Sequence, residues 1–227
     1  MLERLLADLW TTLNTFWNSN FGTAVISAFI GSLAGAWGGA LAAERIAEKR
    51  RVREQLLKEI NQTNAAIELS HTICSSYLNL KEQHVRGVWE DYQRKREQVH
   101  DLRERQRHGA MAPRTVPTIQ LDQRTLDVVR AKIEHLEGLV LGELSLRGRP
   151  RPLVAILSQT MDSLNNSITL RNQLIVSART LDDNAKVAFY FGLPTEGGVD
   201  DTFGNVLEAV HKQTDDCIYF SWRCARI

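Results

Sequence analysis

Residues 21–43 read FGTAVISAFIGSLAGAWGGALAA and contain no charged side chain. An apolar helix of about 20 residues crosses the roughly 30 Å hydrocarbon core of a bilayer. We therefore predict a single transmembrane helix over residues 20–43. The rest of the chain is markedly more polar, so this stretch separates a short N-terminal segment from a long C-terminal one.

A cleavable signal peptide is the alternative for the same stretch, because the Ala-Leu-Ala sequence at residues 40–42 resembles a small-residue cleavage site. Two features favour the membrane anchor. The apolar stretch is longer than the roughly 7 to 15 residues of a signal peptide's apolar core. The segment before it carries Glu3 and Asp8 beside Arg4, where a signal peptide has a basic cluster.

Basic residues on either side of the stretch predict its orientation, since they stay on the cytoplasmic side of a membrane helix. Only Arg4 precedes the stretch. The basic residues that follow it closely are Arg45, Lys49, Arg50, Arg51, Arg53 and Lys58. We expect a bacterial inner-membrane protein with its N-terminus outside and its C-terminal domain in the cytoplasm. The absence of metal or disulfide spacing among Cys74, Cys217 and Cys224 fits that reducing compartment.

Small residues recur every four positions within the stretch, and we expect them to form one helix face. They are Ser27, Gly31, Gly35, Gly39 and Ala43. Small side chains let membrane helices approach closely, so this face predicts a homo-oligomer in the lipid bilayer. The alternative is that Gly and Ala are simply common in membrane helices. A ring of such helices would also be able to enclose a pore.

Residues 1–19 have apolar side chains at the spacing of an amphipathic helix. Trp10 and Trp17 on that face suit a helix lying in the membrane interface. On the opposite side of the membrane, Arg50 and Arg51 are expected at the interface. Residues 18–20 then break the amphipathic pattern.

The C-terminal part is predicted to be all-α, a bundle of about four to five helices on a long stalk. The stalk covers residues 44–108 and the remaining helices residues 119–227. Gly and Pro are missing from residues 40–86, so the anchor is expected to continue into the stalk as one helix. Within residues 119–227, apolar spacing, caps and turn residues predict helices over 121–146, 152–181, 183–191 and from about 200 to 222, and no strand.

The totals of the sequence exclude several classes. The chain has 227 residues, of which 43% are hydrophobic and 24% charged, with five Pro and three Cys. Disordered, collagen-like and disulfide-scaffold proteins have other compositions. The net charge of +1 gives no global attraction to nucleic acid. Residues 94–107 are locally basic and raise a nucleic-acid or phospholipid contact as an alternative, but the interspersed acids favour a solvent-exposed helix.

Metal and cofactor motifs give no positive signal. Acidic pairs occur at residues 182–183, 200–201 and 215–216. The first two pairs stand where helix N-caps are expected, and carboxylates are favoured there. The sequence has no phosphate-binding Gly-rich loop, no GxSxG and no Cys/His cluster. We therefore expect no cofactor and no metal.

Residues 130–135 read Arg-Ala-Lys-Ile-Glu-His, which resembles the Arg, four-residue spacer, His motif of the HEPN superfamily of ribonucleases. In that all-helical family, paired motifs of a dimer cleave RNA without a metal. The resemblance covers six positions. It implies that His135 acts in the 2′-hydroxyl chemistry and that Arg130 stabilises the phosphate. An exposed helix face is the alternative for both residues. A membrane helix joined to such a domain also resembles the layout of membrane-associated accessory effectors of bacterial antiviral systems.

Three function hypotheses follow. The leading one is a single-pass membrane protein that self-associates through its glycine-rich helix and carries a cytoplasmic helical sensor or effector domain. Its output is a change at the membrane in a bacterial defence or stress response, with an oligomeric pore among the candidate forms. The alternatives are a membrane-tethered, metal-independent ribonuclease using Arg130 and His135, and a non-enzymatic scaffold that recruits a cytoplasmic protein partner to the membrane.

Overall fold

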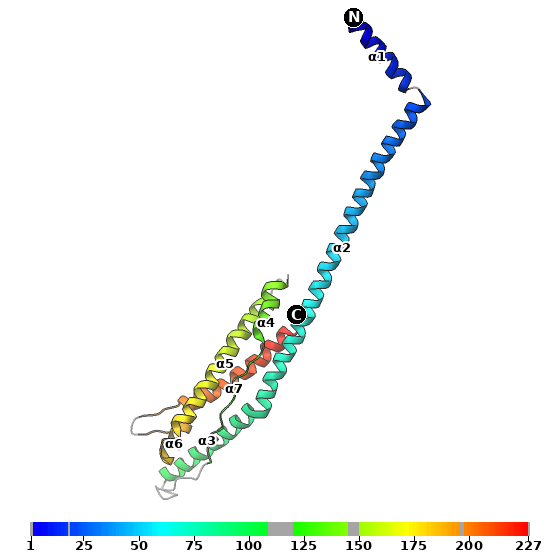
Figure 1. Cartoon of the computed structure of the whole chain (residues 1–227). Helices are drawn as coiled ribbons and strands as arrows, with labels where there is room; N and C mark the ends of the chain where they lie inside the picture. Colours follow the sequence, from blue (N-terminus) through cyan, green and yellow to red (C-terminus); the bar gives the residue numbers. More distant parts are fainter. Residues whose placement is uncertain (1, 18, 109–119, 145–149, 196–197, 227) are drawn as a thin grey trace. The chain divides into compact units, whose positions relative to one another are not determined.

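The computed structural model describes residues 2–17, 19–108, 120–144, 150–195 and 198–226. These residues are helical or irregular and contain no strand beyond an isolated bridge between Thr195 and Gly198. The all-α prediction is therefore confirmed. The chain divides into two compact units, Met1–Lys58 and Glu59–Ile227, which we describe separately. Helix α2 (Asn20–Leu80) contributes residues to both units (Figure 1).

A tight corner joins helix α1 (Leu2–Trp17) to α2 in the first unit. The carbonyl oxygen of Phe16 accepts hydrogen bonds from the backbone N–H and the hydroxyl of Ser19, at 3.2 and 2.8 Å. The hydroxyl oxygen of Ser19 in turn accepts from the N–H of Gly22 at 3.0 Å. A Cβ at Gly22 would lie 1.9 Å from the Phe16 carbonyl oxygen, so the corner requires glycine. The predicted break over residues 18–20 includes residue 18, which lies outside the described residues.

The apolar part of α2 has the length and composition of a membrane span. The continuous helix Asn20–Arg107 contains an 18-residue window with a mean hydropathy of 1.6, none of it buried. The core helix of a soluble protein would be mostly buried, whereas a signal sequence near the N-terminus has the same properties. Its hydroxyl groups are satisfied within the helix: Ser27 donates to the carbonyl oxygen of Thr23, and Ser32 to that of Phe29. Such bonds lower the cost of placing hydroxyls in hydrocarbon.

The second unit consists of helices and helical turns joined by irregular segments. After α2 come the π-helical turn η1 (Lys81–Val85), α3 (Arg86–Arg107), α4 (Ile133–Glu137), the π-helical turn η2 (Gly138–Glu143), α5 (Pro150–Ala178), α6 (Asp183–Phe191) and α7 (Thr202–Cys224). Helices α5 and α7 lie side by side along most of their lengths (Figure 1).

Two apolar clusters form the core of this unit. The larger one joins α2, α4, η2, α5 and α7 and includes the fully buried Tyr77, Leu136 and Leu164. The smaller one is aromatic and joins α3, α6 and α7. Its rings include Tyr92, Tyr190, Phe191 and Phe203, of which Tyr190 and Phe203 stack with centroids 4.1 Å apart. Core packing therefore accounts for most of the aromatic residues near α6.

The first acidic pair caps its helix as predicted, whereas in the second the N-cap residue of α7, Asp201, makes no side-chain cap bond and the residue before it contacts the helix start. One carboxylate oxygen of Asp182 accepts a hydrogen bond from the N–H of Ala185 at the start of α6, at 2.9 Å. Asp200 likewise accepts from the N–H of Thr202, the first residue of α7, at 3.0 Å. Gly192 ends α6 in the left-handed region, with φ of 63°, where glycine is favoured.

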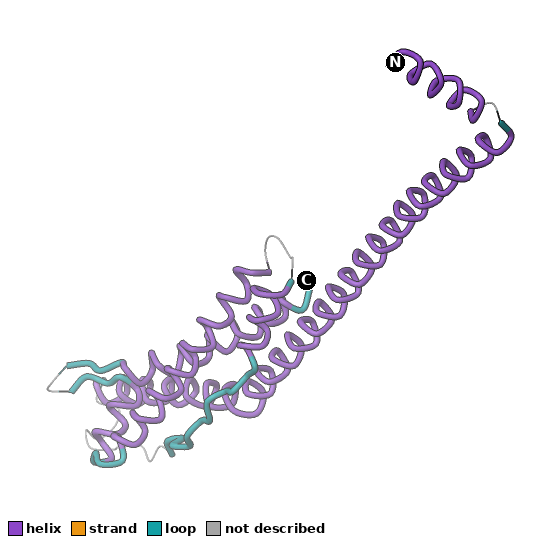
Figure 2. Tube along the Cα trace, turned by 45° about the horizontal axis from the view of Figure 1, so that its top comes forward, coloured by secondary structure: helices purple, strands orange, loops and turns teal. Residues whose placement is uncertain are grey.

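The helix predicted over residues 121–146 is wrong for its first half. Residues 120–132 form a non-helical segment that is drawn out after a turn at Asp122, and the helical turns begin only at Ile133 (Figure 2). A carboxylate oxygen of Asp122 accepts from the N–H of Arg124 at 3.0 Å, which is a turn-forming bond that competes with helix. Further along, the backbone of Leu126 and Val129 bonds to side chains of α5. These tertiary bonds override the apolar spacing that indicated a helix.

The other boundaries differ less. The predicted stalk helix to residue 108 is interrupted by η1, where Lys81 makes a salt bridge with Asp215 of α7. π-Helical turns commonly mark such local adjustments in a helix. The predicted loop over residues 109–118 and most of the turn before residue 150 lie outside the described residues.

Candidate functional site

The small residues of the first unit occupy one face of α2. An α-helix turns about 100° per residue, so Gly31 and Gly39 lie within about 40° of Gly35, and Ser27 and Ala43 within about 80°. The large apolar side chains between residues 26 and 41 all lie about 120° or more away from Gly35. They are Ile26, Phe29, Ile30, Leu33, Trp37 and Leu41. One face of this helix is thus nearly bare backbone, and the opposite face is bulky.

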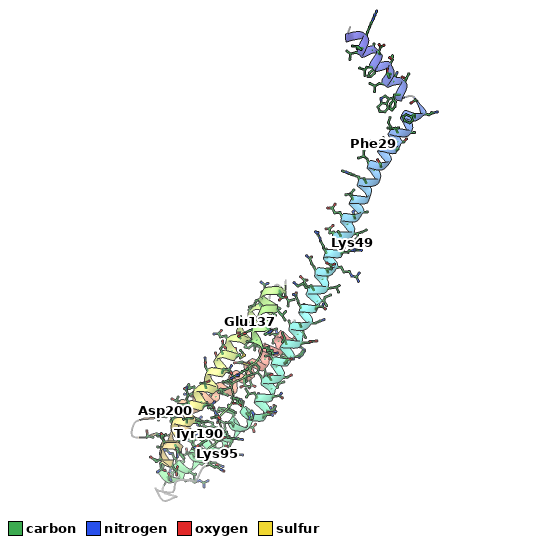
Figure 3. The ribbon with its side chains drawn as sticks, viewed as in Figure 1. Phe29, Lys49, Lys95, Glu137, Tyr190 and Asp200 are labelled. Atoms are coloured by element: carbon green, nitrogen blue, oxygen red, sulfur yellow. The ribbon has the colours of Figure 1, made fainter. Side chains whose placement is uncertain are left out.

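No described residue covers the small-residue face. A Cβ built at Gly31, Gly35 or Gly39 would have no atom within 4 Å, apart from its own helix backbone and chain neighbours. Ser27 and Ala43 are also exposed. Figure 3 shows side chains such as Phe29 and Lys49 projecting from this part of α2. A larger side chain on the small-residue face would therefore disturb no contact with another described residue.

The same face stays apolar beyond the predicted span. Ile46 lies about 20° from Gly35 around the helix, Leu57 about 40° and Leu56 about 60°. Their exposed fractions are 55%, 51% and 54%. Lys49 and Arg53 lie between them on that face. Large apolar side chains exposed in a row on a polar helix indicate a contact surface.

The predicted interface residues are also exposed. Trp10 is 74% exposed and Trp17 56%, on a helix α1 whose other large apolar side chains are uncovered as well. Arg50 and Arg51 are exposed on α2. An uncovered apolar face with tryptophans is typical of a helix in the interface of a membrane.

The predicted catalytic pair is not assembled into a site within the chain. Arg130 lies in the extended segment, and His135 lies in the short helix α4. Both side chains are exposed, and neither has a hydrogen bond or salt bridge to another described residue. Because Arg130 is not helical, the two do not share a helix. No neighbouring acid or base within the described residues prepares either one for proton transfer.

The third acidic pair, at residues 215–216, takes part in a contact between helices. Asp215 of α7 pairs with Lys81 of η1, and the His211 ring lies 3.9 Å from the same carboxylate. The His211 ring also stacks on Trp89 of α3, with centroids 5.1 Å apart. Within the described residues, no group of three His, Cys, Asp or Glu side chains could hold a metal ion. The role of Asp215 here is to join helices.

A buried arginine is the most unusual polar group of the second unit. Arg171 on α5 is 0% exposed. Its Nη1 donates a hydrogen bond to the carbonyl oxygen of Arg124 at 2.9 Å, while its Nε and Nη2 have no acceptor among the described residues. Burial lowers the pKa of Arg171 from its ordinary value. A buried guanidinium normally has a carboxylate partner, because desolvating a charge is costly.

The carboxylate of Asp122, which acts on Arg171 electrostatically, is engaged elsewhere. Asp122 accepts hydrogen bonds from the side chain of Arg124, at 2.7 to 3.2 Å, and these bonds hold the pKa of the Asp122 carboxyl below its usual value. The Arg124 side chain is 81% exposed. Tyr190 donates to the carbonyl oxygen of Asp122 at 3.2 Å, and Lys95 to that of Gln120 at 2.5 Å. In Figure 3, Lys95 and Tyr190 lie near each other at one end of the unit.

The sequence analysis missed this cluster. The sequence feature that could have indicated it is the pair Arg171 and Asn172 on an otherwise apolar helix, with Asn165 seven residues earlier. An open pocket of about 470 Å³ lies beside Asp122, lined by Asp91 and Lys95 of α3 and by residues 120–124.

The three cysteines are buried in the second unit. Burial raises the pKa of Cys217 to about 12 and that of Cys224 to about 11. Cys74 is 7% exposed, with its Sγ 3.8 Å from the carbonyl oxygen of Ile218. Thiols in such surroundings pack as small apolar groups and are poor nucleophiles.

No family model, curated protein or solved structure matches this chain.

Proposed function

We propose that this chain is a single-pass membrane protein that self-associates through one face of α2 and carries a cytoplasmic helical sensor or effector domain. Its output is a change at the membrane, with an oligomeric pore as one form of that output. The proposed setting is a bacterial defence or stress response at the inner membrane. One observation carries the proposal: the small-residue face centred on Gly35 and the exposed apolar residues Ile46, Leu56 and Leu57 share one side of the helix.

The two parts of this face suit the two solvents that they would meet. In lipid, no hydrophobic force joins helices, so close approach of backbones over Gly31, Gly35 and Gly39 supplies the contact. In water, burial of apolar side chains drives association, and Ile46 and Leu57 offer them. Copies inserted with the same orientation are parallel, so equivalent residues meet at the same level.

Two basic residues on this face oppose association. Lys49 and Arg53 lie between the apolar side chains, and parallel copies bring their like charges together. Their long stems let the charged ends reach water at the edge of the contact. Because salt screens exposed charges, association through this face becomes stronger as ionic strength rises.

The test is the mass of the full-length protein in nanodiscs and mild detergent, compared with two single variants. Gly35→Leu places a bulky side chain on the small-residue face. Ala40→Leu adds similar bulk about 140° around the helix and serves as the control. We expect a discrete oligomer for the wild type and Ala40→Leu, and a monomer for Gly35→Leu. A wild-type monomer in both media contradicts the proposal and leaves the scaffold alternative, which predicts a co-purifying protein and no ion conductance.

The ribonuclease alternative has its own test. The full-length protein and its His135→Ala variant are incubated with structured and single-stranded RNA. Loss of cleavage in the variant alone would support Arg130 and His135 as a catalytic pair formed between copies. Equal products from both proteins would rule that assignment out.

A further inference from the structure

The extended residues 122–129, here called the strap, are held on α5 as a bound peptide is held. The carbonyl oxygen of the Asn172 side chain accepts from the N–H of Leu126 at 3.0 Å, and the Asn172 Nδ2 donates to the Leu126 carbonyl oxygen at 2.7 Å. Asn165 makes the same pair of bonds with Val129, at 3.0 and 3.1 Å. Each asparagine side chain thereby pairs with the backbone as a neighbouring strand would.

The spacing of the two asparagines matches an extended backbone. Seven residues of α-helix separate Asn165 from Asn172, a rise of about 10.5 Å. Three residues of extended chain, from Leu126 to Val129, cover about 10 Å. The two asparagines therefore bind the backbone amides and carbonyls of an extended segment and make no hydrogen bond to its side chains.

The strap has few side chains buried in the site. Leu126 is 6% exposed and the partly buried Val129 packs against the larger core cluster, while Gln123, Thr125 and Asp127 are exposed. The site on α5 therefore requires apolar residues three positions apart, each with a free backbone amide.

Arg171 has hydrogen-bond donors for which the strap provides no acceptor. Its guanidinium donates to the carbonyl oxygen of Arg124, yet Nε and Nη2 have no acceptor in the described part of the chain. The carboxylate of Asp122 is close enough to affect Arg171 electrostatically, but it is held by the exposed side chain of Arg124. A segment with an acid at position 122 and no arginine at position 124 would have a free carboxylate for Arg171.

We propose that Asn165, Arg171 and Asn172 form a binding site for an extended acidic peptide segment of a partner protein, which replaces the strap. The segment carries an acidic residue four positions before an apolar one, as Asp122 stands before Leu126, and lacks an arginine between them. The strap is then an internal competitor that occupies the site until such a partner is present. This proposal is independent of self-association in the membrane.

Open space beside Asp122 and along α5 near Asn172 gives the segment access. One pocket lies beside Asp122, as described above. A second, of about 440 Å³, is lined by Thr169, Asn172, Gln173, Val176 and Ser177 on α5. Both pockets adjoin the part of the site that holds Asp122 to Leu126, because Asn172 bonds to Leu126 and α5 runs on from there toward Arg124.

The test uses three fluorescent peptides and the full-length protein in nanodiscs, with binding followed by anisotropy. The first peptide has the sequence of residues 120–131. The second carries Arg124→Ala, and the third carries Arg124→Ala together with Asp122→Asn. We expect the second to bind about ten-fold more tightly than the first and the third to lose that gain. Equal binding of the second and third peptides, or no binding of any, overturns the proposal.

A variant of the protein itself gives the reciprocal result. Arg124→Ala in the full-length chain frees Asp122 for Arg171, so the strap should hold more firmly and the second peptide should bind about ten-fold more weakly. Arg124 is exposed, so the substitution leaves the core intact, and Arg130→Ala on the same segment is the control. Hydrogen exchange shows whether the peptide displaces the strap, because displacement should expose the amides of Leu126 and Val129. Unchanged protection of these amides with bound peptide would place the peptide elsewhere and overturn the proposal.

Discussion

The bond pair between Asn172 and Leu126 gives a quantitative prediction about stability. Asn172→Ala removes both hydrogen bonds and leaves the N–H and carbonyl of Leu126 without partners, in a residue that is 6% exposed. A buried backbone group left unsatisfied costs about 1–3 kcal/mol. The two groups together predict a loss of about 2–6 kcal/mol in the free energy of unfolding. In a domain of this size class, each kcal/mol lowers Tm by about 2–4 °C, so Tm should fall by roughly 4–24 °C.

The measurement is thermal unfolding of the full-length protein in one detergent, followed by near-ultraviolet circular dichroism. Asn166→Ala is the matched control, because Asn166 is an asparagine on the same helix, next to Asn165, and is exposed. Its Tm should stay within the error of the wild type. Asn172→Asp keeps the acceptor and loses the donor, so its Tm should lie between those of the wild type and Asn172→Ala. If Asn172→Ala and Asn166→Ala unfold at the same temperature, the strap is not held by these bonds.

Three further predictions concern other parts of the chain. Gly22→Ala should open the corner between α1 and α2, because a Cβ there collides with a backbone carbonyl oxygen, and a spin label pair across the corner should show a longer, broader distance distribution. The pKa of Asp122 is lower in the folded than in the unfolded protein, so its contribution to stability is present above the unfolded pKa and is lost as pH falls through the folded pKa. Asp122→Asn should therefore remove that part of the dependence of Tm on acid pH. An unchanged profile of Tm against pH would contradict the pairing with Arg124. The Cys217 and Cys224 thiols should resist alkylation at pH 8 in the folded protein and react on unfolding, as a timed mass-spectrometric assay would measure.

The sequence predicts those elements whose signals are local. The apolar residues 21–43, the glycine spacing and the cap at Asp182 each act within a few turns of helix, and the structure bears out the helical class and the Asp182 cap. The membrane position, the oligomer and the catalytic role of His135 stay predictions.

The sequence does not predict the features that depend on distant partners. Residues 120–132 have helical apolar spacing, but the backbone of Leu126 and Val129 bonds to Asn172 and Asn165 on α5 instead of forming helical hydrogen bonds. The same long-range contacts bury Arg171, which in the sequence reads as an ordinary polar residue. Such side-chain to backbone pairing has no periodic signature, so it becomes visible only with the fold.

Cysteine cross-linking in membranes tests the central claim, association of parallel copies through one face of α2, most directly. Single cysteines are introduced at Ile46, Lys49, Arg53 and Leu56, on the face centred on Gly35, and at Arg51, Gln55 and Lys58, about 140° or more away. The wild type serves as the background, because its native cysteines are buried. The account predicts cross-linked dimers from the first set and few from the second, with Gly35→Leu abolishing both. Equal cross-linking around the helix, or none at any position, would contradict it.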